Sequence, residues 1–123
     1  MKKVLVVEDD EFILDLYKRQ LENAGFSVTT AMDGEQVAEK VNDRPDLVLL
    51  DVMLPKKNGL DVLRDLKANE LTRSIPVILL TNLGQDSIVK QGFELGASGY
   101  LIKSSVTPNE VIHQVTDFLD KNN

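Results

Sequence analysis

The chain has 123 residues, of which 42% are hydrophobic and 28% charged, and it contains no cysteine. This length suits a single domain that buries a core without disulfides. The lack of cysteine excludes disulfides, thiolate metal sites and cysteine nucleophiles. The net charge of −6 disfavours a direct grip on nucleic acid phosphates. No apolar run approaches the roughly 20 residues of a membrane span, so we expect one cytoplasmic domain over residues 1–123, without membrane or direct nucleic acid contact.

Short apolar runs alternate with longer amphipathic stretches along the chain. The runs cover residues 4–7, 26–31, 47–50, 77–80 and 100–102. Three of them are continuously apolar, which is typical of parallel strands covered on both faces. These runs therefore predict the strands of a buried parallel sheet.

Apolar residues at helical spacing follow each run. They span residues 13–24, 37–41, 60–66, 88–95 and 107–119. Asp10 is placed to cap the first of these helices, and Thr107 with Glu110 forms a capping box at the start of the last. The alternation predicts an α/β fold of the (βα)₅ type, a doubly wound five-stranded parallel sheet with helices on both faces.

Polar side chains follow the ends of four predicted strands. They are Glu8, Asp9 and Asp10 after the first run, Asp51 after the third, Thr81 and Asn82 after the fourth, and Lys103 and Ser104 after the fifth. In an open α/β sheet, ligands bind at the carboxyl ends of the strands. A helix cap, a turn or a solvated lysine would explain any one of these residues. It would not explain why they share one edge of the sheet.

Three of the four acids in this group would repel one another unless a hard cation lay between them, and the fourth, Asp10, is the expected helix cap. Glu8, Asp9 and Asp51 offer the oxygen ligands that Mg²⁺ prefers, and Mn²⁺ is the expected substitute. A zinc site is not expected, because the chain has one histidine and no cysteine. That histidine, His113, lies off the apolar stripe of its helix and is interpreted as a surface residue.

Asp51 can serve as a carboxylate nucleophile towards a phosphoryl group once a metal shields its charge. The new oxyanions then need donors. Thr81 offers a hydroxyl and Lys103 a positive charge, and backbone N–H groups near Met53 and Asn82 are further candidates.

Together these motifs resemble the receiver domain of bacterial two-component response regulators. The segments that carry the resemblance are residues 4–10, 49–55, 58–59, 76–81 and 96–103. The resemblance implies the flavodoxin-like strand order 2-1-3-4-5. It also implies a histidine kinase or phosphotransfer protein as phosphoryl donor, and a downstream effector protein or fused output domain as recipient of the signal.

The same resemblance assigns roles to individual residues. Asp51 becomes the phosphoacceptor, Asp9 contacts Mg²⁺, and Glu8 acts mostly through water. The backbone carbonyl of Met53 becomes a further metal ligand.

Thr81 and Lys103 would contact the phosphoryl oxygens. Tyr100 becomes a switch residue that turns inward when Thr81 is drawn to the phosphate. This motion changes the surface formed by the fourth helix, the fifth strand and the fifth helix.

Three positions depart from the family pattern. Ser104 stands where proline usually follows the lysine, so we expect a trans bond between Lys103 and Ser104. Asn82 stands where a smaller residue is common, and Glu8 replaces the more frequent aspartate.

We therefore expect a signalling switch whose only catalysis is its own phosphorylation and dephosphorylation, not an enzyme for external substrates. One alternative is a flavodoxin-like cofactor carrier, but the acids at residues 8–10 would repel the phosphate of a cofactor. Another is a Mg²⁺-dependent aspartyl phosphohydrolase. Such enzymes usually carry a second aspartate where Met53 stands.

Overall fold

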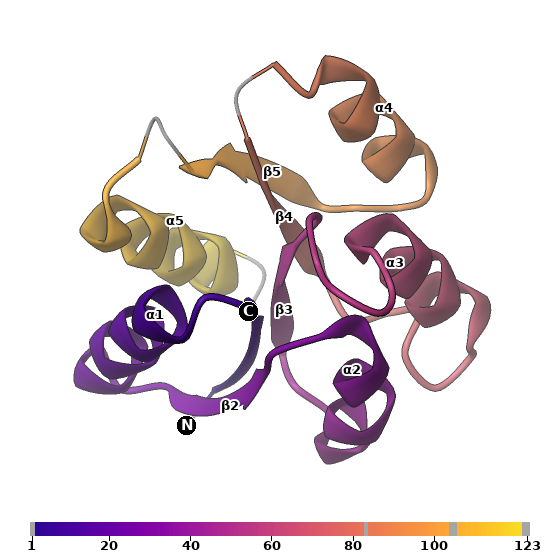
Figure 1. Ribbon diagram of the computed structural model, residues 1–123. Helices are drawn as coiled ribbons and strands as arrows, with labels where there is room; N and C mark the ends of the chain where they lie inside the picture. Colours follow the sequence, from indigo (N-terminus) through magenta and orange to yellow (C-terminus); the bar gives the residue numbers. More distant parts are fainter. Residues whose placement is uncertain (1, 83, 104–105, 122–123) are drawn as a thin grey trace.

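The computed structural model describes residues 2–82, 84–103 and 106–121. Strands and helices alternate along these segments (Figure 1). The strands are β1 (Lys3–Val7), β2 (Ser27–Ala31), β3 (Leu47–Asp51), β4 (Val77–Thr81) and β5 (Gly99–Ile102). The α-helices are α1 (Glu11–Asn23), α2 (Gly34–Lys40), α3 (Gly59–Ala68), α4 (Asp86–Glu94) and α5 (Pro108–Lys121), and a short 3₁₀ turn, η1 (Val41–Asp43), follows α2.

The strands form one parallel sheet in the order β2-β1-β3-β4-β5. This arrangement confirms the predicted fold class and strand order. In register, Val7 pairs with both Ala31 and Leu50, and Thr81 pairs with Ile102. The carboxyl ends of the strands therefore lie along one edge of the sheet.

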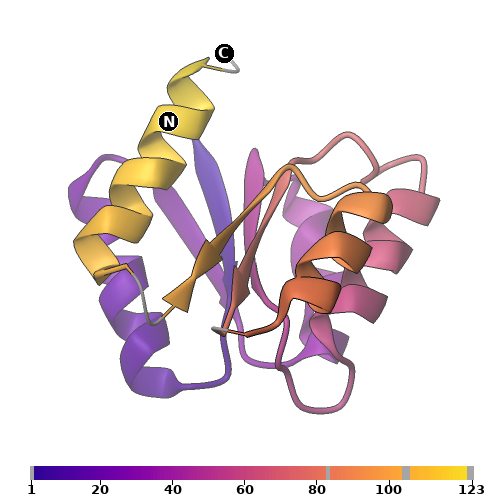
Figure 2. The same cartoon turned by 90° about the horizontal axis from the view of Figure 1, so that it is seen from above.

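Helices cover both faces of the sheet. Helices α1 and α5 lie on one face, and α2, α3 and α4 lie on the other (Figures 1 and 2). Alternate strand residues supply the two cores: Leu5, Leu50 and Leu79 belong to one, and Val6 and Leu80 to the other. Both faces of the central strands are dry, which explains their continuously apolar sequence.

Polar side chains fix where the helices begin. Asp10 accepts from the Ile13 N–H at 3.1 Å, and Thr107 accepts from the Glu110 N–H at 3.2 Å, so both predicted caps are confirmed. Helix α2 begins three residues earlier than the apolar pattern predicted, at Gly34 rather than residue 37. The apolar pattern missed the signal for this start, which is a capping pair formed by Asp33 and, three residues later, Gln36.

Both side chains of this pair accept a backbone N–H in the structure, although Gln36 reaches the residue before the cap and not Asp33 itself. The Asp33 carboxylate accepts from the Gln36 N–H at 2.9 Å, and the Gln36 side chain accepts from the Met32 N–H at 2.9 Å. Within the described residues, no helix is long and apolar enough to cross a membrane.

Candidate functional site

Three predicted acids meet at the carboxyl edge of the sheet. Glu8 and Asp9 follow β1, and Asp51 ends β3. One carboxylate oxygen from each lies within 4.8 Å of the others. Glu8 and Asp51 are buried, at 1% and 3% exposure, whereas Asp9 is exposed. This set of oxygen donors, open on one side, fits a hard divalent cation.

Lys103 joins two of these acids across the sheet. Its ammonium lies 2.9 and 3.2 Å from the two Glu8 oxygens and 2.9 Å from Asp51 Oδ2. The lysine is placed there because β5 ends at Ile102, one residue before it, beside the end of β4. It partly neutralises the buried acids and faces the outer oxygen of Asp51.

Burial shapes the protonation of this cluster. Burial, together with the adjacent Asp51 carboxylate, raises the pKa of Glu8 to about 8, against the lowering effect of Lys103. Burial by itself would lower the pKa of Lys103, but its hydrogen bonds to Asp51 and Glu8 raise that pKa above the ordinary value. Lys103 is therefore a permanent cation in this site.

Asp51 is held by backbone as well as by Lys103. The Met53 N–H donates to Asp51 Oδ1 at 2.9 Å, so each carboxylate oxygen has a partner. Met53 itself is 57% exposed. Gly59, the first residue of α3, donates from its N–H to the Val52 carbonyl at 2.9 Å and so brings α3 against the end of β3.

Thr81 ends β4 and is fully buried, at 0% exposure. Among the described residues, its Oγ1 is a buried side-chain polar atom without a hydrogen bond partner. Such an atom costs free energy unless a ligand or water completes it. The neighbouring Asn82 N–H, by contrast, donates to the Gln85 side chain at 2.8 Å. In this structure the N–H groups of Asn82 and Met53 are thus both paired, and their donation to a phosphoryl group stays a prediction.

Two further predictions concern the last strands and the loops after them. Tyr100 is 43% exposed and packs edge-on against Phe93, so it lies outward in this structure. The bond between Lys103 and Ser104 lies outside the described residues. His113 is exposed on α5, as predicted.

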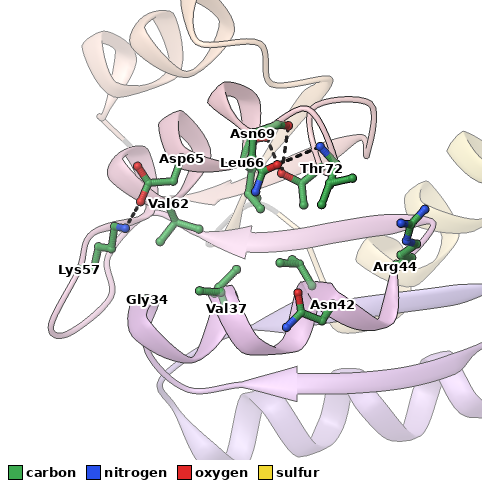
Figure 3. A pocket seen from close by; sticks show the side chains of 13 residues that line it. Gly34, Val37, Asn42, Arg44, Lys57, Val62, Asp65, Leu66, Asn69 and Thr72 are labelled. Atoms are coloured by element: carbon green, nitrogen blue, oxygen red, sulfur yellow. Dashed lines mark hydrogen bonds and ion pairs between the residues drawn. The ribbon is translucent and has the colours of Figure 1, made fainter.

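A separate hollow of about 220 Å³ lies between α2 and α3. Figure 3 shows its lining, which includes Val37, Val62 and Leu66, with the Lys57–Asp65 ion pair at one end. Among the described residues, none of those predicted for the acidic edge lines this hollow. The hollow is therefore distinct from the acidic edge.

The strand order and the acidic edge with its lysine are those of an open α/β domain whose ligand site lies at the carboxyl ends of the strands. A family described as "Response regulator receiver domain" matches residues 4–116. This chain therefore belongs to the response regulator receiver family, the signalling modules of two-component systems.

A curated relative agrees with this assignment. The transcriptional regulatory protein CpxR of Escherichia coli (strain K12) is 48% identical over 103 residues, which are 84% of this chain and 43% of CpxR. The chain thus spans less than half the length of that relative.

Solved structures of response regulators match as well. The receiver domain of the Francisella response regulator 1452 has a TM-score of 0.88 and 28% identity, and the match covers 100% of both chains. The Mn²⁺-bound form of response regulator Rcp1 has a TM-score of 0.86 and 28% identity, with 97% of this chain and 94% of Rcp1 covered.

Proposed function

We propose that this chain is a phosphorylation switch that accepts a phosphoryl group on Asp51. The observation that carries the proposal is the surrounding of Asp51: a buried carboxylate with Lys103 at 2.9 Å, two further acids within 4.8 Å, and the unpartnered hydroxyl of Thr81 at the end of the adjacent strand. The donor is a phosphohistidine of a histidine kinase or phosphotransfer protein. A small acyl phosphate can replace it.

The transfer uses groups that are already in place. An Asp51 oxygen attacks phosphorus as the phosphorus–nitrogen bond of the donor breaks, and the histidine leaves with the bonding electron pair. The Lys103 ammonium, which contacts Asp51 Oδ2, stabilises the negative charge on the transferred group. The Thr81 hydroxyl donates to another phosphoryl oxygen and so gains the partner that it lacks.

Glu8, Asp9, Asp51 and the backbone carbonyl of Met53 would hold the divalent cation, with Asp9 as the exposed ligand and Glu8 acting through water. The carboxylate cluster supports Mg²⁺, and the Mn²⁺-bound form of Rcp1 supports Mn²⁺ as a substitute. A bound cation would neutralise the negative charge that Asp51 and the phosphoryl group bring together.

The output is a change at the surface formed by α4, β5 and α5. When Thr81 turns to the phosphoryl group, the Tyr100 ring turns inward, into the hollow that these two residues line. The relative CpxR is a transcriptional regulator longer than this chain, which supports a fused output domain or a separate effector protein as the recipient. This domain itself, at a net charge of −6, would not contact nucleic acid.

The proposal is tested by phosphoryl uptake from acetyl phosphate with Mg²⁺. Intact-mass spectrometry should show one added phosphoryl group on the wild type and none on Asp51→Asn, which keeps the shape of the side chain but not its nucleophilic charge. Equal labelling of Asp51→Asn would overturn the assignment. Sustained turnover of a small phosphoester would instead favour the phosphohydrolase alternative.

The exposed Met53 side chain predicts a long-lived phosphoryl group. Hydrolysis needs a water in line with the phosphorus–oxygen bond, and an apolar side chain beside Asp51 cannot orient one. Met53→Asn should therefore speed the loss about three- to tenfold, which needs only about 0.7–1.4 kcal/mol off the barrier.

The measurement is the decay of phosphoprotein after the donor is removed, at constant Mg²⁺. Met53→Leu, which is apolar and of similar size, is the matched control and should decay at the wild-type rate. Equal decay of Met53→Asn and Met53→Leu would contradict the shielding argument. Leu83, two residues after Thr81, is a second apolar residue that the sequence indicates on the path of this water. It lies outside the described residues.

A further inference from the structure

Two exposed aromatic residues face each other at the edge of the sheet. Phe93 of α4 is 47% exposed and Tyr100 of β5 is 43% exposed. Their ring centroids lie 5.9 Å apart with an interplanar angle of 87°, which is the favourable edge-to-face arrangement. Within the described residues, the Tyr100 side chain has this ring contact and no side-chain hydrogen bond.

Close packing of α4 on the sheet brings the two rings together. Gly92 is buried, and a Cβ at this position would lie 2.3 Å from Cδ1 of Leu79. Leu79 is in turn the register partner of Tyr100. The helix can therefore approach β4 closely. Phe93 follows Gly92 in the sequence and so lies beside Tyr100, the neighbour of Leu79 on β5.

A hollow lies between this aromatic pair and the phosphoryl site. It measures about 210 Å³, and its lining includes both Thr81 and Tyr100, with Val89 of α4 and Ile102 of β5. A cavity of about 150 Å³ accepts benzene, so there is room for the Tyr100 ring. The outward position therefore needs a cause other than lack of space.

We propose that Phe93 is a positioning residue that holds the Tyr100 ring outward. It thereby sets how much free energy phosphorylation must supply to turn the ring inward. This inference rests on the proposed function of Asp51, Thr81 and Tyr100. The edge-to-face contact exists only while the ring is outward. It stabilises the resting state and is lost when the ring enters the hollow.

Linkage gives the consequence for ligand affinity. A phosphoryl group favours the inward state, so any contact that favours the outward state weakens phosphoryl binding by the same factor. Loss of the Phe93 ring should therefore tighten binding of a phosphoryl mimic by roughly three- to tenfold, equivalent to about 0.7–1.4 kcal/mol, within the range of an aromatic pair.

The test follows Tyr100 directly, by fluorine NMR of protein labelled with 3-fluorotyrosine. The chain has two tyrosines, and the resonance of Tyr100 is assigned by its loss in Tyr100→Phe. The probe is beryllofluoride with Mg²⁺, a mimic of aspartyl phosphate. The variants are Phe93→Leu, which removes the ring, Phe93→Tyr, which restores it, and Phe12→Leu as a control, because Phe12 is also exposed but lies on α1.

In Phe93→Leu without ligand, the Tyr100 resonance should move towards its beryllofluoride-bound position, and the Kd for beryllofluoride should fall three- to tenfold. Phe93→Tyr should restore both values, and Phe12→Leu should change neither. An unchanged resonance and Kd in Phe93→Leu, or an equal effect of Phe12→Leu, would overturn the proposal. A shift that depends on protein concentration would also overturn it, because the ring contact is intramolecular.

The same experiment separates this inference from the proposed function. Failure of the wild type to bind beryllofluoride would overturn the assignment of Asp51. The ligand-free resonance of Tyr100 in Phe93→Leu would still decide whether Phe93 holds the ring outward.

Discussion

Chelation of divalent cations should reduce phosphoryl uptake from acetyl phosphate below detection. Three acids, Glu8, Asp9 and Asp51, lie together, and the Lys103 ammonium contacts two of them. A phosphoryl donor adds further negative charge to this edge, so without a divalent cation the approach to Asp51 is opposed by repulsion. Intact-mass spectrometry in EDTA, and after Mg²⁺ is restored, measures the effect.

The same cation should stabilise the fold. Mg²⁺ relieves repulsion that exists only when the chain is folded, so it should stabilise the folded state by mass action. The free energy of unfolding should gain about 2.7 kcal/mol at a hundred times the Kd, and the unfolding temperature should rise with Mg²⁺ concentration. Asp9→Ala removes the exposed ligand and should suppress this rise. Asp117→Ala, which removes an acid on α5 whose side chain is 48% exposed, should retain it. Full Mg²⁺ stabilisation of Asp9→Ala would place the cation elsewhere. Uptake unaffected by EDTA would show that phosphorylation of Asp51 needs no divalent cation.

The sequence was sufficient for the fold and for the composition of the acidic edge. Parallel strands must be apolar on both faces, and their carboxyl ends must share an edge, so residues directly after the runs were bound to meet. Glu8, Asp51 and Lys103 met for this reason. The prediction needed only the strand ends, not any side-chain conformation.

Side-chain geometry was beyond the sequence. Lys103 contacts both carboxylate oxygens of Glu8 and one of Asp51. These contacts depend on the side-chain rotamers and on the burial of Glu8. The pairing of Phe93 with Tyr100 depends on how closely α4 approaches β4, which a helical pattern does not state. Tertiary contacts of this kind are decided after the elements have formed.

Capping was predicted only in part, for a different reason. The apolar pattern marks the buried stripe of a helix and not its first turn, which is often polar. Helix α2 therefore looked shorter than it is, although Asp33 and Gln36 were present to mark its start. Polar cap residues and apolar periodicity have to be considered together.

Gly59→Ala should destabilise the protein and disturb Asp51, although Gly59 touches no ligand in the proposed site. A Cβ at this position would lie 2.5 Å from the Asp51 carbonyl oxygen and 2.5 Å from Val52 Cα. Both are backbone atoms, so relief requires movement of the end of β3 or of α3. Overpacking typically costs about 1–3 kcal/mol. Alanine is favoured over glycine by about 1 kcal/mol in a helix interior, and this is an upper limit for Gly59, the first residue of α3. Because the obstacles are backbone, we expect a net loss of about 2 kcal/mol.

Gly99→Ala is the matched control for this substitution. A Cβ at Gly99 would meet nothing within 4 Å, and its φ is not positive. Alanine there should leave stability unchanged or raise it by about 0.4–1 kcal/mol, because it restricts the unfolded chain. Urea unfolding of both variants gives the free energies, and the rate of labelling by acetyl phosphate reports on Asp51. Gly59→Ala should lose stability and label slowly, whereas a wild-type free energy and rate would show that α3 can move away from β3 without cost.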